Sequence, residues 1–216
     1  MIKRIKEPVN CLTHLFGAIL SIVGLVLLVY NAAETATVWH IVTFSIFGAS
    51  LIALYTASSV YHMLDISKKI NRILRKIDHM MIYFLIAGTY TPICLVALRG
   101  AWGWTIFTII WTVAIAGMII KAVWINVPRI VSTLSYIIMG WIVVIAFFPL
   151  VKNLSLAGVT WLILGGVMYT VGGVIYALKK PNITNKYFGF HEIFHIFIIL
   201  GSICHFIVMF NYILYI

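Results

Sequence analysis

Charged residues are scarce in this sequence, and acidic ones are the scarcest. Only 9% of the 216 residues are charged, with five Asp and Glu in total, whereas 63% are hydrophobic. A soluble domain averages about 25% charged and about 45–50% apolar residues. A soluble core of this size could not bury so much apolar surface, so the composition predicts an integral membrane protein.

Cysteine is also rare, and its placement excludes two classes of small protein. The three cysteines, Cys11, Cys94 and Cys204, stand alone in or beside apolar runs. They therefore form neither a disulfide framework nor a thiolate metal cluster. We expect them to pack as small buried hydrophobic residues.

Long apolar runs account for most of the chain. A helix of about 20 mostly apolar residues crosses a membrane, and we predict seven such spans joined by short connections: 11–31, 39–63, 77–98, 102–120, 130–150, 156–178 and 188–213. The predicted fold is an all-α bundle of seven transmembrane helices, forming one domain over residues 1–216 in a cell membrane. The basic start followed by an apolar run resembles a signal peptide, but that run exceeds the roughly 7–15 residues of a cleavable one, so we expect a retained helix.

Basic residues are distributed unevenly between the predicted loops. Two of the 15, Arg99 and Lys152, fall on one side of the membrane, and 13 fall on the other: Lys3, Arg4, Lys6, Lys68, Lys69, Arg72, Arg75, Lys76, Lys121, Arg129, Lys179, Lys180 and Lys186. The positive-inside rule therefore predicts a cytoplasmic N-terminus and an external C-terminus. The net charge of +10 then reflects topology and contact with anionic lipids, and does not indicate a nucleic-acid partner.

The last predicted span starts with an HExxH pattern, in the stretch "FGFHEIFHIF". On a helix this pattern holds zinc in many metalloproteases, with the glutamate as general base. Here the three residues are His191, Glu192 and His195. Ionisable side chains inside a bilayer are costly, so each one is a candidate functional residue.

The predicted topology brings candidates from three spans to one membrane level. Ser58 and His62 end the second span, Asp78 lies in the first turn of the third, and His191 and His195 lie in the first two turns of the seventh. Residues four apart share a helix face. Three neutral imidazoles suit Zn²⁺, which keeps an open position when catalytic, so Asp78 would hold a metal-bound water or act as a fourth ligand. A buried hydrogen-bond network without metal is the alternative.

The other histidines fit this cluster less well. His205 lies ten residues beyond His195, about 15 Å along a helix, and one ion cannot bind both. We expect His205 to be a packing or relay residue. We expect His14 to make a hydrogen bond between helices, with a place beside the same cavity as the alternative. His79 and His40 are assigned structural roles.

Taken together, these stretches resemble the hemolysin III branch of the progestin and adipoQ receptor family, within a wider superfamily of heptahelical membrane hydrolases. The resemblance covers essentially the whole chain and depends on "EPVNCLTHLFGA", "SSVYH", "KIDHMMIYFLIAGTYTP", "HEIFHIF" and "CHF". It implies seven spans with an inward N-terminus, in agreement with the charge distribution.

The resemblance also implies roles for individual residues. His62, His191 and His195 would hold zinc, Asp78 would reach the metal through water, and Ser58 would orient that water. The HExxH stretch would then be an HxxxH pair with a coincidental glutamate. By analogy with receptors linked to ceramidase activity, the reaction would be hydrolysis of a lipid amide or ester, with membrane lipids as partners.

Two functions of other classes remain open at this point. One is a cytolysin or pore, which the family name asserts, although the sequence has no amphipathic segment that could move from water into a membrane. The other is a sensor or receptor of membrane state in which zinc is structural. The sequence alone gives neither the substrate nor the oligomeric state.

Overall fold

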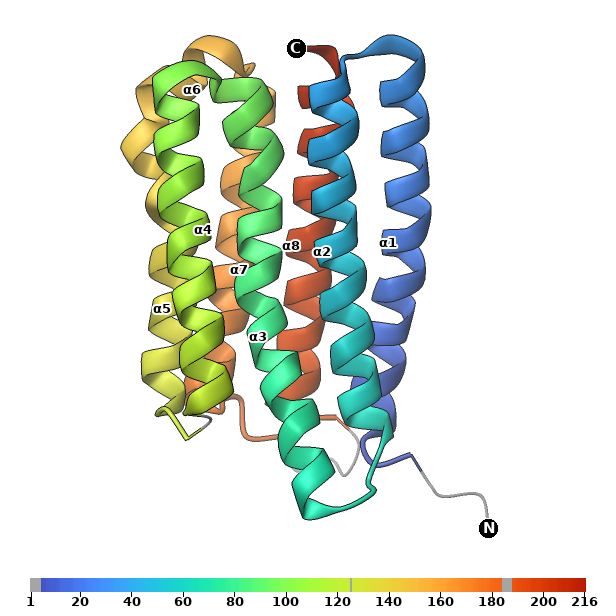
Figure 1. Cartoon of the computed structure of the whole chain (residues 1–216). Helices are drawn as coiled ribbons and strands as arrows, with labels where there is room; N and C mark the ends of the chain where they lie inside the picture. The colour runs from blue at the N-terminus through green and yellow to red at the C-terminus, as the bar shows by residue number, and fades with distance from the viewer. Residues whose placement is uncertain (1–4, 125, 184–187) are drawn as a thin grey trace.

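Seven long helical spans run side by side in the computed structural model, which describes residues 5–124, 126–183 and 188–216 (Figure 1). Within those residues the elements are α1 (Pro8–Thr35), α2 (Val38–Met63), α3 (Lys68–Pro92), the π-helical η1 (Ile93–Leu98), α4 (Gly100–Val123), α5 (Arg129–Trp141), the 3-10 helix η2 (Ile142–Ala146), α6 (Phe147–Asn153), α7 (Leu156–Leu178), α8 (Phe190–Asn211) and the 3-10 helix η3 (Ile213–Tyr215). The seven predicted spans are confirmed, each long and apolar enough to cross a membrane. The chain is a multi-pass membrane protein.

An odd number of spans places the start of α1 and the C-terminus at opposite ends of the bundle (Figure 1). We call the end where α1 begins the N-terminal end. Ten of the basic residues in the described part of the chain lie at that end, and Arg99 and Lys152 lie at the other. Lys3, Arg4 and Lys186, which belong to the same predicted group, lie outside the described residues.

The third span begins earlier than predicted, at Lys68 and not at residue 77. Ser67 caps it, because its side chain accepts a hydrogen bond from Ile70 N. The added turns carry most of the basic residues of the second loop, and they project beyond the neighbouring helices (Figure 1). Apolar length fails to detect such turns because they lie outside the hydrocarbon region.

The fifth span is divided into three segments by a side chain from the third. The hydroxyl of Tyr90 donates to Gly140 O at 2.7 Å and accepts from Val143 N at 2.8 Å. A side chain that enters the helical hydrogen-bond ladder in this way changes the local helix type. The helix accordingly becomes 3-10 over Ile142–Ala146.

One serine fixes α8 between its neighbours α2 and α7. Ser202 Oγ hydrogen-bonds the hydroxyl of Tyr55 on α2 at 2.6 Å and that of Tyr169 on α7 at 2.9 Å. Gly201 allows this approach, since a Cβ at that position would lie 2.4 Å from the Tyr169 ring. These contacts lie two helical turns beyond His195 and so hold the N-terminal half of α8 in register with α2.

Candidate metal centre

Three histidines converge at the N-terminal end of the bundle. His62 lies in the last turn of α2, and His191 and His195 lie in the first two turns of α8. One ring nitrogen from each lies within 4.8 Å of the others, so the three could hold a metal ion. His62 and His195 are each 1% exposed. Nitrogen atoms so arranged and so protected from water could serve as the donor set of a metal site.

Glu7 fixes the orientation of His62. His62 Nδ1 donates to Glu7 Oε2 at 2.5 Å, and Glu7 N donates back to His62 O at 3.0 Å. The hydrogen bond from His62 lowers the pKa of the Glu7 carboxyl from 4.5 to about 2, so Glu7 is ionised at neutral pH. A carboxylate only accepts hydrogen bonds, so the proton of His62 lies on Nδ1 and the lone pair on Nε2.

Thr13 fixes the tautomer of His195 in the same way, with the proton on Nδ1. The Thr13 hydroxyl lies 2.9 Å from Val9 O and 3.1 Å from Asn10 O, so its single proton is directed to these carbonyls. Its oxygen lies 3.3 Å from His195 Nδ1 and therefore accepts from that nitrogen. His195 Nε2 is left with a free lone pair.

The first span and the residue just before it therefore orient two of the three imidazoles, although they contribute none of them. A partner on the second ring nitrogen fixes the tautomer and raises the basicity of a metal-binding histidine. The sequence analysis did not identify Glu7 or Thr13 as part of the site, since they lie 55 and 182 residues from their partners. The available signal was their place in "EPVNCLTH".

Asp78 and Ser58 lie beside the three imidazoles. Asp78 and Ser58 both line the cavity that His191 and His195 border, and Asp78 lies within electrostatic range of His62. In the described part of the chain, only the three histidines bring ligand atoms within 4.8 Å of one another. This arrangement places Asp78 next to the potential ligands and outside their immediate group.

His14 lies against the cluster but makes a contact that differs from the predicted one. No described residue hydrogen-bonds either of its ring nitrogens, so the expected bond between helices is wrong. Its ring stacks on His195, with centroids 3.5 Å apart and planes 9° from parallel. The alternative prediction, that His14 borders the cavity, is confirmed.

Two further histidines are placed as expected. His40, at the opposite end of the bundle, hydrogen-bonds Thr37 and Ile213 O, which is a structural role. His205 packs against Gly165, where a Cβ would lie 2.8 Å from its ring. His205 also lines the cavity, but it does not belong to the group of three.

Glu192 has a structural partner that accounts for its position in HExxH. Its Oε2 accepts a hydrogen bond from Gly189 N at 2.7 Å, which caps the N-terminus of α8. A glutamate at the third helical position commonly reaches back in this way. The cavity beside the histidines is not lined by Glu192.

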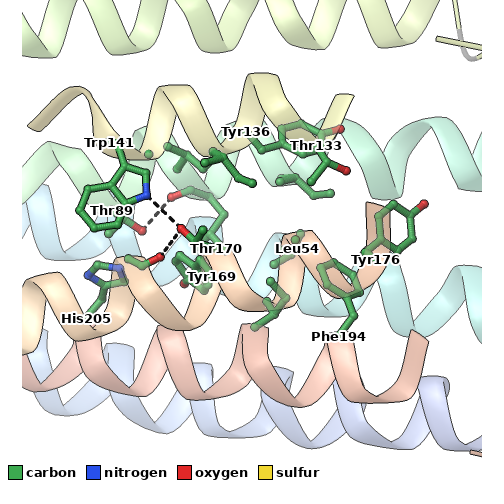
Figure 2. Close-up of a pocket in the computed structure, with 18 of the residues that line it drawn as sticks. Leu54, Thr89, Thr133, Tyr136, Trp141, Tyr169, Thr170, Tyr176, Phe194 and His205 are labelled. Carbon is green, nitrogen blue, oxygen red and sulfur yellow. Dashed lines mark hydrogen bonds between the residues drawn. The ribbon is translucent and has the colours of Figure 1, made fainter. Parts of the chain in front are cut away.

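A cavity of about 400 Å³ extends from the histidines into the bundle. Figure 2 shows Thr133, Tyr136 and Trp141 of α5 on one side and Tyr169, Thr170 and Tyr176 of α7 on another. Its deeper walls are largely apolar and reach Leu150 and Val159. This volume is in the range of small-molecule sites, and the lining suits an acyl chain.

Known proteins similar to this chain identify its family. A family model described as "Haemolysin-III related" matches residues 2–206. The chain belongs to the haemolysin-III-related family. The predicted membership of the hemolysin III branch of the progestin and adipoQ receptor family is thereby confirmed.

Relatives of this haemolysin-III-related chain occur in bacteria and in mammals. "Hemolysin-3" of Bacillus cereus is 39% identical over 99% of this chain and 95% of its own length. "Hemolysin-3 homolog" of Bacillus subtilis is 42% identical over 92% and 90%. The human "Monocyte to macrophage differentiation factor" is 27% identical over 96% and 84%.

Proposed function

We propose that this haemolysin-III-related protein is a zinc-dependent hydrolase of a lipid amide or ester, with its N-terminus in the cytoplasm. The observation that carries the proposal is the convergence of three imidazoles beside a largely apolar cavity. Zinc is the choice of metal because neutral imidazole is a preferred donor and three protein ligands leave one position open. The oriented rings of His62 and His195 fit that requirement.

Individual residues of the chain would then have separate roles in the hydrolysis. Zinc, when bound, would supply a Lewis acid for a carbonyl and an activated water. The Asp78 carboxylate would accept a proton from that water, since it lies beside the three imidazoles. Ser58, which lines the same cavity as Asp78, would orient that water. The apolar cavity would take the acyl chain and exclude bulk water.

A lipid-product assay tests the activity directly. Purified full-length protein would be reconstituted into vesicles containing a ceramide and an ester of the same fatty acid, and the released acid measured by mass spectrometry. We expect release by the zinc-loaded protein, loss after chelation, and recovery when zinc is restored. Leakage of an entrapped dye without fatty acid release would favour the cytolytic activity that the name of the Bacillus cereus relative indicates. Neither product nor leakage would favour a sensor with structural zinc.

The orientation in the membrane gives a separate prediction. A reporter enzyme active only in the cytoplasm should be inactive when fused after Ile216 and active when fused before residue 1. The reason is that 13 of the 15 basic residues lie on the N-terminal side. A C-terminal fusion that behaves as cytoplasmic would contradict the orientation and move the histidines to the outer surface.

Glu7 should control the affinity for zinc. Glu7→Ala removes the acceptor for His62 Nδ1, and partners of this kind typically change metal affinity by about 10–100-fold. Glu7→Gln should lose less, because its amide oxygen still accepts the bond. Competition with a chromophoric chelator measures both. Glu34→Ala, at the other end of α1, is the matched control and should bind zinc as tightly as the wild type. Equal zinc affinity of Glu7→Ala and the wild type would show that the Glu7 carboxylate does not contribute to metal binding.

A further inference from the structure

Three basic side chains line the N-terminal end of the cavity: Arg75 of α3, Lys121 of α4 and Arg129 of α5. We call this group the basic mouth. All three lie within electrostatic range of His79, which lines the same part of the cavity. Positive-inside topology explains why basic residues occur at this end, but it does not explain why they face into a cavity.

Lys121 is the most unusual of the three. It is 2% exposed, and its Nζ donates to Ser132 Oγ at 2.5 Å. Within the described part of the chain, none of the three basic residues forms a salt bridge with a carboxylate. A charge buried without a counter-ion is costly, so buried charges are normally paired. An anion at the mouth would provide the missing partner.

The balance of charge indicates what kind of anion fits. The chain has five acidic residues, and among the described residues lining the cavity Asp78 is the single carboxylate. Three positive charges face one negative charge, and Lys121 is buried and Arg129 half-buried while Arg75 is exposed to solvent, so the mouth keeps a net positive charge that a dianion matches best. A phosphate monoester carries about −1.5 to −2 at neutral pH, whereas a carboxylate carries one negative charge.

The shape of the cavity indicates what is attached to the anion. On α7 the lining extends from Tyr176 beside the mouth to Val159, about 25 Å at a helical rise of about 1.5 Å per residue. Its walls beyond the mouth are largely apolar, with Leu150 and Leu162 at the far end. That length is most of the roughly 30 Å hydrocarbon thickness, so it accommodates an extended acyl chain.

We propose that the basic mouth binds the phosphate monoester of a membrane lipid whose acyl chain occupies the apolar part of the cavity. The side chain of Arg129 is already positioned at the mouth. Its Nη1 donates to Tyr176 O at 3.2 Å, and its guanidinium lies 4.6 Å from the centre of the Tyr176 ring. Its remaining N–H groups are suited to a phosphate, which arginine binds in a bidentate manner. Lys121 adds a point charge. None of the three is a member of the histidine group, so the site does not rest on the proposed hydrolysis.

Binding to detergent-purified full-length protein tests the proposal, with native mass spectrometry as the readout. The probe is dioleoyl phosphatidic acid, compared with dioleoylglycerol, which has the same chains and no phosphate, with oleate, and with inorganic phosphate. We expect phosphatidic acid to bind at least about tenfold more tightly than the other three. Equal binding of dioleoylglycerol would overturn the role of the phosphate, and equal binding of oleate would assign the mouth to a carboxylate. Equally tight binding of inorganic phosphate would show that the site does not require a lipid and would overturn the proposal.

Variants distinguish binding at the basic mouth from non-specific attraction of the anionic lipid to the basic surface. Lys121→Met keeps the length of the side chain without its charge, and Arg75→Gln changes an exposed residue with little risk to folding. Each should weaken phosphatidic acid binding by roughly 10–100-fold, and Lys69→Met, an exposed lysine at the same end, should not. Weakening by Lys69→Met to the same extent would show non-specific attraction and overturn the site. Chelator-treated protein should bind as well as untreated protein, and loss of binding on chelation would assign the headgroup to the metal.

Discussion

Replacement of His195 with alanine should remove nearly all zinc from the purified protein. The ring lies at the centre of the site: it is 1% exposed, it stacks on His14, and Thr13 fixes its Nδ1. Two remaining imidazoles leave an incomplete site on rigid helices, which cannot move to replace the lost donor. The loss of affinity should therefore exceed the roughly 100-fold upper range for changes outside the ligands themselves. Elemental analysis of protein purified without added zinc gives the stoichiometry.

His205→Ala is the matched control for this variant. It also removes a buried imidazole from α8 that lines the same cavity, but His205 is not a member of the group of three. It should retain about one zinc per chain, as in a single three-histidine site, so the comparison separates loss of a ligand from loss of packing. Thermal unfolding followed by tryptophan fluorescence checks that both variants fold. Equal zinc in wild type and folded His195→Ala would refute the assignment.

The second large effect distinguishes the catalytic role proposed for Asp78 from that of Glu192. Asp78→Asn should retain zinc and lose nearly all hydrolytic activity, because the amide keeps the shape of the side chain but cannot accept the proton. General acid–base catalysis typically contributes about 10²–10⁴-fold, which sets the expected loss. Glu192→Gln should keep both zinc and activity, since a glutamine at that position still accepts the bond from Gly189 N.

A metalloprotease mechanism predicts the opposite pattern. In that case Glu192 would be the base, and Glu192→Gln would be inactive while Asp78→Asn remained active. Assays of both variants on a ceramide and on a transmembrane peptide distinguish the two mechanisms. Activity of Asp78→Asn on the ceramide at the wild-type rate would contradict the role proposed for Asp78, whatever the result with the peptide.

Hydrophobic length was enough to predict all seven spans, because the bilayer imposes the same requirement on each. It was not enough to locate the start of α3 at Lys68, where the first turns are polar, or the change to 3-10 helix at Ile142. The second feature depends on Tyr90, a residue some 50 positions away whose hydroxyl enters the helix only once the bundle is assembled. No local pattern in the fifth span contains that information.

The site was predictable to the extent that its spacing is local. The pair His191 and His195 follows from helical periodicity, and membrane level brings His62 to the same depth. The role of Glu7 was not predicted, because it precedes the first span and meets His62 only where the start of α1 packs beside the end of α2. The same limit applies to Lys121, whose position in the sequence indicates topology but does not reveal that its side chain is buried in the assembled bundle.

The order in which the residues of the metal site are synthesised has a consequence for how the protein matures. Two of the three imidazoles, His191 and His195, lie on α8, the seventh of the described spans in chain order, and Thr13 of α1 orients His195. A nascent chain with six inserted spans carries a single imidazole of the site, so it cannot retain the metal. A metal held by the three histidines would therefore bind only after α8 has inserted, and it would link α8 to α2, which is synthesised much earlier. A chain truncated before residue 190 would insert its first six spans but lack α8. The surface that α8 normally covers would then be exposed to quality-control proteases.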